Sequence, residues 1–152
     1  MSGVKVIDHG LDKIVRESVR LGDLEIAAGI LPNHFDDAYD NGMTIGEVAT
    51  IQVYGTSTIP KRDFIGGTAD AYREKTADVM QKQVGLVLDG SLTPEAAAAD
   101  LGKWFHGRIN AHIDNGPWAR NAPSTVKKKG RDDPLKDTKL LYNAIDHEVR
   151  KK

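Results

Sequence analysis

The residue types best suited to metal binding and acid–base chemistry are spread thinly along this 152-residue chain. It contains five histidines: His9, His34, His106, His112 and His147. His106 is followed four residues later by Asn110, and His112 is preceded four residues earlier by Arg108. Neither spacing gives the His–His or His–Glu pair with which zinc sites are built on a helix. We therefore predict that the protein has no metal site and no cofactor.

Two loops resemble ligand-binding motifs only in part. Asp36, Asp37 and Asp40 cluster in one loop, but an EF-hand also requires alternating ligands, a central glycine and a terminal glutamate. The segment GTSTIPKRDFIGG, residues 55–67, has glycines and a lysine but lacks the Gly-Lys-Ser/Thr order of a phosphate-binding loop. Because no paired catalytic groups occur at a meaningful spacing either, we expect the protein not to be an enzyme.

Positive charge is concentrated in STVKKKGR, residues 124–131. Such a cluster could contact nucleic acid, so a small DNA-binding regulator is one interpretation. Against it, Asp132, Asp133 and Asp137 follow closely, and the whole chain has a net charge of −1. A solvated or partner-facing segment is the preferred interpretation.

Length and composition favour one soluble domain over residues 1–152. A domain of about 150 residues can bury roughly 68–70% of its unfolded surface, which is enough for a core. The absence of cysteine excludes disulfides and thiolate metal sites, and it is compatible with a reducing cytosol. No stretch approaches the roughly 20 apolar residues of a membrane span, so we expect no membrane association.

The N-terminal part of the chain is predicted to form a helix, a strand and a loop. In the N-terminal helix region, residues 1–23, apolar side chains between Leu11 and Val19 share one helical stripe. Residues 24–31 alternate as a strand that ends at Pro32. The polar segment that follows, residues 32–43, is predicted to be an exposed loop.

Capping signals predict three further helices. Thr44 and Glu47 have the spacing of a capping box, so residues 45–54 are predicted to be helical and to end at Gly55. Thr68 is expected to cap a helix over residues 69–88. Thr93 and Pro94 open another over residues 94–115, and the two form a long helical hairpin.

The C-terminal part is predicted to be an extended loop within the domain, residues 117–139, followed by a strand over residues 145–150. This strand should pair with residues 24–31. The predicted fold class is α+β: a small antiparallel sheet packed against the long helical hairpin, with extended loops available for subunit contacts.

Two aromatic residues stand out because each lies in a loop flanked by proline and charge. Phe64 ends the stretch VYGTSTIPKRDF, residues 53–64, and Trp118 follows Pro117. We therefore expect both to be exposed. Exposed aromatic side chains in such loops are candidate anchors of a protein interface. Pro60 would stiffen the first loop and reduce the entropy that it loses on docking.

The order of motifs resembles a family of tailed-bacteriophage and prophage neck proteins, described as tail-completion or virion-morphogenesis proteins. Members of that family have an aromatic-Gly-Thr turn, a Pro-x-Arg-Pro-Phe loop and a late Pro-Leu-x-Asp-Thr-Gly-x-Leu segment. The matching residues are Tyr54, Gly55 and Thr56 in the turn, Pro60, Arg62 and Phe64 in the loop, and Pro134, Leu135, Asp137, Thr138 and Leu140 in the late segment. Two positions depart from the pattern: Asp63 replaces a proline and Lys139 replaces a glycine.

The resemblance implies a non-enzymatic structural subunit of the virion neck, which completes the tail and helps to join it to the head while DNA passes. It further implies a homo-oligomeric ring, a hexamer by this resemblance, that contacts other neck and tail proteins. DNA would pass without sequence-specific binding. The protein would be assembled in the host cytoplasm and would reside in the virion. A tail terminator or a connector ring subunit is the alternative within the same class. The motif residues together with Trp118 are the candidate subunit-interface residues.

Overall fold

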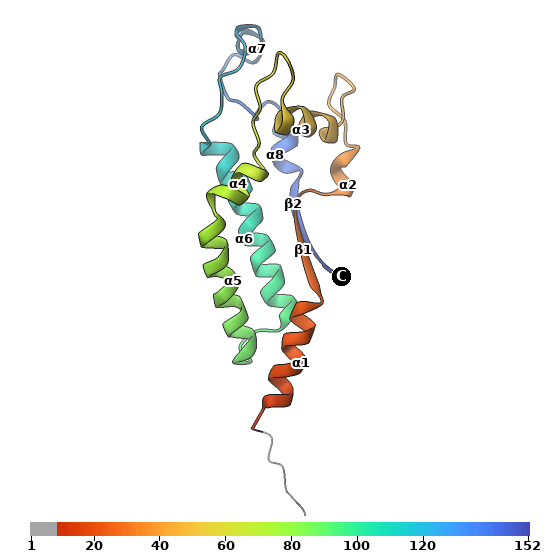
Figure 1. Cartoon of the computed structure of the whole chain (residues 1–152). Coiled ribbons are helices and arrows are strands. Elements are labelled where there is room, and N and C mark those ends of the chain that lie inside the picture. Colours follow the sequence, from red (N-terminus) through yellow and green to blue (C-terminus); the bar gives the residue numbers. More distant parts are fainter. Residues whose placement is uncertain (1–8) are drawn as a thin grey trace, which may run out of the picture.

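The molecule is elongated, with long helices toward one end and short helices and loops gathered at the other (Figure 1). The computed structural model describes residues 9–152, so the first part of the predicted N-terminal helix region lies outside the described residues. The elements in chain order are α1 (Leu11–Gly22), β1 (Leu24–Ile30), α2 (Pro32–Phe35), α3 (Ile45–Tyr54), α4 (Gly66–Ala71), α5 (Arg73–Leu88), α6 (Pro94–Asn115), α7 (Pro123–Lys129), α8 (Leu140–Asn143) and β2 (Ile145–Lys151).

The predicted α+β class and the predicted strand pairing are confirmed. β1 and β2 form a two-stranded antiparallel sheet in which Ala28 lies opposite His147 and Ile30 lies opposite Ile145. Both strands pack on α6, the longest helix, as Figure 1 shows. Because side chains alternate across a strand, every second residue of each strand shares one face of this sheet.

The capping predictions for α3 and α6 are confirmed. The Thr44 hydroxyl accepts a hydrogen bond from the Glu47 N–H, and the Glu47 carboxylate accepts one from the Thr44 N–H. At the start of α6, the Thr93 hydroxyl accepts a hydrogen bond from the Ala96 N–H. Gly55 follows α3 with a positive φ of 75°.

The prediction of one continuous helix over residues 69–88 is wrong. The chain forms α4 and α5, which are separated at Tyr72, where φ is −112° and ψ is 16°. Thr68 lies inside α4 and is buried, and its hydroxyl donates to the Phe64 carbonyl at 2.6 Å. The threonine therefore does not cap a helix start. The hairpin of α5 and α6 that we predicted is present.

Two segments predicted to be loops contain short helices. The segment 117–139 includes α7, which carries most of the basic cluster, and the segment 32–43 begins with α2. Within the latter, Ala38 and Thr44 form an isolated antiparallel bridge. Such local order arises because Pro32 and Pro123 each occupy the first position of a helix, where a missing N–H costs nothing.

The main core lies where α3, α6, α8 and β2 meet, toward the loop end of the molecule. Its buried residues are Ile45, Ala49, Phe64, Ile109, Ile113, Leu135, Leu141, Ala144 and Ile145. Over the described residues, no helix is long and apolar enough to span a membrane.

Candidate functional site

The turn after α3 is ordered by its own backbone. The Thr56 N–H donates to the Ile59 carbonyl at 2.8 Å, and the Thr56 hydroxyl accepts from the Ile59 N–H at 3.0 Å. A β-carbon on Gly55 would lie 2.9 Å from the Lys61 nitrogen, and φ is positive there. Glycine is therefore required at this position by both space and conformation. The Gly-Thr pair of the motif determines the shape of the turn.

Phe64 is buried, which corrects the expectation of an exposed aromatic residue in this loop. Its exposed fraction is 0%, and it packs in the main core with Ile109 and Ile113 of α6. The prediction of exposure failed because the loop folds back onto the core: the Arg62 N–H donates to the Gln52 carbonyl of α3 at 2.6 Å. This backbone hydrogen bond directs the following residues inward.

Arg62 is also buried, with an exposed fraction of 4%, and it joins three segments. Its Nε donates to the Ala119 carbonyl at 3.0 Å, and its two terminal nitrogens donate to the Gln52 Oε1 at 2.9 Å and to the Arg120 carbonyl at 3.1 Å. Burial lowers the pKa of Arg62 below its ordinary value, and the nearby Asp132 carboxylate partly opposes this effect. The guanidinium thus fixes residues 119–120 against α3.

Asp132 holds the same segment from the other side. Its Oδ1 accepts a hydrogen bond from the Asn121 N–H at 2.9 Å, and its Oδ2 forms an ion pair with Arg120 Nε at 3.0 Å. Residues 119–121 are therefore held between a buried arginine and a half-buried carboxylate. This arrangement explains why a segment with few apolar residues has a defined conformation.

Asp63, the residue that departs from the family pattern, has a structural role of its own. Its Oδ1 accepts a hydrogen bond from the N–H of Gly66, the first residue of α4, at 2.7 Å. Its other oxygen lies 3.4 Å from the Lys61 Nζ. A β-carbon on Gly66 would lie 2.7 Å from that carboxylate. Asp63 therefore orders the loop by hydrogen bonding, where a proline would do so by fixing φ.

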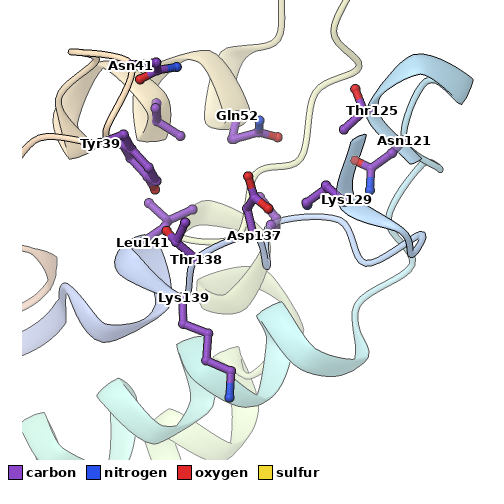
Figure 2. A pocket seen from close by; sticks show the side chains of 12 residues that line it. Tyr39, Asn41, Gln52, Asn121, Thr125, Lys129, Asp137, Thr138, Lys139 and Leu141 are labelled. Carbon is purple, nitrogen blue, oxygen red and sulfur yellow. The ribbon is translucent and has the colours of Figure 1, made fainter. Parts of the chain in front are cut away.

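The late motif segment lines a cavity of about 210 Å³ at the loop end of the molecule. Figure 2 shows that Gln52 of α3, Lys129 of α7 and Asp137 of the late segment come to it from three different elements. Burial lowers the pKa of Lys129, and the Asp137 carboxylate opposes that effect. Leu135 and Thr138 also line this cavity. The structure thus brings Leu135, Asp137 and Thr138 together, beside the Arg62 contacts.

Lys139, the second departure from the family pattern, adopts a left-handed conformation. It precedes α8 with φ of 63° and ψ of 5°, and Leu135 is the other described non-glycine residue with positive φ, at 64°. A glycine at position 139 would adopt this conformation without strain. The side chain of Lys139 extends away from the cavity in Figure 2.

Trp118 is half-buried, which corrects the expectation that it is an exposed anchor. Its indole N–H donates to the Ile113 carbonyl at 3.0 Å, and its ring meets His112 edge to face at a centroid distance of 4.9 Å. The indole therefore contacts the C-terminal end of α6 and packs on the main core. Pro134 is half-buried as well.

The exposed members of the motifs are Tyr54, Thr56, Pro60, Asp137 and Thr138. Tyr54 is 76% exposed and is therefore the exposed aromatic side chain of this region, in place of Phe64. Aromatic side chains at this level of exposure are candidate contacts for a partner. Of the motif's two aromatic residues, only Tyr54 is free to make such a contact without unfolding the loop.

A second set of exposed apolar side chains, which we call the helical apolar surface, lies on α1 and α5. It consists of Ile14, Val15 and Val19 on α1 and Met80, Val84 and Leu88 on α5, all exposed. None of the residues of α1 is buried, although the helix has a well-defined apolar stripe. The stripe itself was predicted from the sequence, but its exposure was not, because a periodic pattern does not reveal what covers it.

The basic cluster of α7 is partly engaged in intramolecular contacts. Lys129 Nζ donates to the Asp133 carbonyl at 3.0 Å, and the Arg131 guanidinium donates to the Asp137 carbonyl at 3.0 Å. Arg131 also forms an ion pair with Asp133 at 2.9 Å. Lys127 and Lys128 are exposed. The acidic residues that follow the cluster in sequence therefore contact it in space as well.

The structure also brings together a group of side chains that the sequence reasoning missed. Nδ1 of His106 on α6 lies 3.4 Å from Nδ1 of His147 on β2, and Asp146 lies beside them. The two histidines are 41 residues apart in the sequence. Spacing rules for metal ligands examine neighbours along one element, so they cannot detect a pair formed between a helix and a strand. The alternation of β2, which placed His147 on the inner face, was the available signal.

Comparison with known proteins adds no relative: no family model, curated protein or solved structure matches the chain.

Proposed function

We propose that the protein is a non-enzymatic structural subunit of a tailed-phage virion, located at the junction of head and tail. In this role it completes the tail and helps to join it to the head while DNA passes through a ring of identical subunits. The proposal starts from the ordered set of motifs that resembles the neck-protein family. The structural observation that supports it most is the helical apolar surface.

Exposed apolar side chains on one helix stripe are costly unless something covers them. Single exposed apolar residues are common in monomers, but contiguous apolar surfaces mark protein contacts. Here Ile14, Val15 and Val19 follow one stripe of α1, and Met80, Val84 and Leu88 of α5 are exposed as well. A subunit that functions in a ring or against other virion proteins would bury this surface on assembly.

The loop end of the molecule supplies a second contact region of different character. Its backbone is held by hydrogen bonds of Arg62 and Asp132 and by the turn at Gly55. Preformed loops lose little entropy when they dock, so such a surface suits repeated contact between subunits. Tyr54 and the cavity beside Asp137 are the features that a neighbour could engage there.

A tail terminator or a connector ring subunit would use the same two surfaces, so these alternatives belong to the same proposal. A small DNA-binding regulator is disfavoured by the pairing of Arg131 with Asp133 and by the net charge of −1. Binding to the phosphates of DNA requires several unpaired lysine or arginine side chains. Each phosphate that such a side chain neutralises raises the affinity for DNA and the dependence of that affinity on salt. A gel shift at physiological salt separates the regulator from the virion subunit.

The experiment that tests the proposed function is electron microscopy of particles made without this protein in its phage–host system. A neck or tail-completion subunit leaves heads and tails unjoined when it is missing. Normal complete particles would exclude the proposal.

A further inference from the structure

We propose that His106, Asp146 and His147 bind one divalent transition-metal ion, with zinc the best match. The ion would link α6 to the C-terminal strand β2. The inference is independent of the proposed function, and it opposes the sequence-based prediction that no metal binds.

The distance between the two imidazoles fits shared coordination. Zinc binds histidine nitrogen at roughly 2.0–2.1 Å, so two nitrogens at the corners of a tetrahedron around it lie about 3.4 Å apart. His106 Nδ1 and His147 Nδ1 are 3.4 Å apart. The same distance is longer than the roughly 2.7–3.2 Å of an ordinary N–H···O hydrogen bond. The distance thus allows an ion between the rings as well as a weak direct hydrogen bond.

Asp146 supplies the third ligand. Its Oδ1 is 3.7 Å from His147 Nδ1, and one ligand atom from each of the three residues lies within 4.8 Å of the others. Two imidazoles and a carboxylate form a known zinc-binding set that leaves a fourth position for water. Oδ1 also accepts a hydrogen bond from the His147 N–H at 2.7 Å, which holds the carboxylate beside the ring.

The backbone around the cluster is shaped to admit the His147 ring. Gly102 lies one helical turn before His106 on α6, and a β-carbon there would be 2.7 Å from Cδ2 of His147. Any larger residue would displace the ring away from the helix. On the neighbouring strand, Ala28 is opposite His147 and Gly29 is opposite Asp146, so both ligands face small residues. The side chains are 26% exposed for His147 and 43% for Asp146, which gives an ion access from solvent.

Binding is tested with untagged protein that has been stripped with a chelator, because a polyhistidine tag would itself bind zinc. Isothermal titration with zinc chloride is expected to give one ion per chain at micromolar protein concentration. The melting temperature should rise with zinc concentration, because the ion binds the folded state preferentially. Absence of stoichiometric binding under these conditions would overturn the proposal and support the sequence-based prediction.

Variants locate the site. His106→Ala and His147→Ala should each weaken zinc binding by more than the roughly 10–100-fold that loss of an outer hydrogen-bond partner costs. Asp146→Asn keeps an oxygen for the His147 N–H but loses the charge, so it should weaken binding without unfolding the protein. His34→Ala, at a half-buried histidine of α2, is the matched control and should bind as the parent does. If Asp146→Asn and at least one of the two histidine variants each bind zinc with the affinity of the parent, the assignment of the site is wrong. Circular dichroism of each stripped variant verifies that it is folded.

Discussion

Arg62 Nε donates a hydrogen bond to the carbonyl of Ala119 at 3.0 Å, across 57 residues of sequence. This contact joins the loop after α3 to the segment that follows α6. The same guanidinium contacts Arg120 and Gln52, so one side chain connects the parts of the chain that form the loop end. An arginine can do this because its planar group presents several donors in fixed directions.

Arg62→Ala is therefore expected to destabilise the isolated subunit by about 3 kcal/mol, since hydrogen bonds from a charged group contribute roughly 1.5–3 kcal/mol and several are lost together. Urea denaturation measures the loss, and hydrogen exchange should show faster exchange in residues 119–121. Arg62→Lys retains the charge without the planar fork, so it should recover only part of the stability. If Arg62→Ala exchanges and unfolds like the parent, the contacts with residues 119–120 do not stabilise the fold.

Phe64→Ala is expected to cost about 3–5 kcal/mol of folding free energy, because it removes a fully buried aromatic ring and leaves a cavity against α6. Tyr54→Ala is the matched control from the same motif. Tyr54 is 76% exposed, and surface substitutions usually change stability by less than about 0.5 kcal/mol. Chemical denaturation of the two variants should separate them clearly. Equal stability of the two variants would show that Phe64 does not contribute to the core and is a surface residue.

Lys139→Gly is expected to stabilise the protein by up to about 1 kcal/mol. The left-handed conformation costs a residue with a β-carbon roughly 1–2 kcal/mol, and the greater freedom of glycine in the unfolded chain offsets part of the gain. Lys139→Ala removes the same long side chain but retains the β-carbon, so it should give no such gain. A thermal melt of the three proteins makes the comparison. A gain in the alanine variant equal to that of glycine would show that strain at this position is not the cause.

Local signals in the sequence were sufficient to predict much of this fold. The capping box at Thr44 and the cap at Thr93 involve residues three apart, and the strand faces follow from alternation, so α3, α6 and the sheet were predictable. Thr68 shows the limit of such signals. A threonine before a helical pattern predicts a cap. Here α4 begins two residues before Thr68, and the Thr68 hydroxyl donates to the carbonyl of Phe64, four residues earlier.

The candidate sites depend on contacts that no local pattern contains. Phe64 has the surroundings of a surface loop, and only the return of the chain onto α3 and α6 buries it. His106 and His147 become neighbours only because β2 packs on α6. Conversely, the stripe of α1 was predictable as a pattern, while its exposure required the whole arrangement of helices to be known.

The central claim, that this chain is a structural subunit joining head and tail, is tested most directly by electron microscopy of particles from a phage lacking the protein. Complementation should use the parent chain, Val15→Asp and Arg16→Asp. Val15 lies in the exposed stripe of α1, so an acid there should leave the subunit folded but prevent burial of the helical apolar surface. Arg16, also exposed on α1 but outside the stripe, is the control.

We predict separate heads and tails without the protein, joined particles with the parent chain and with Arg16→Asp, and few joined particles with Val15→Asp. Complete particles in the absence of the protein would contradict the account. Joining by Val15→Asp at the parent level would show instead that the helical apolar surface is not an assembly contact.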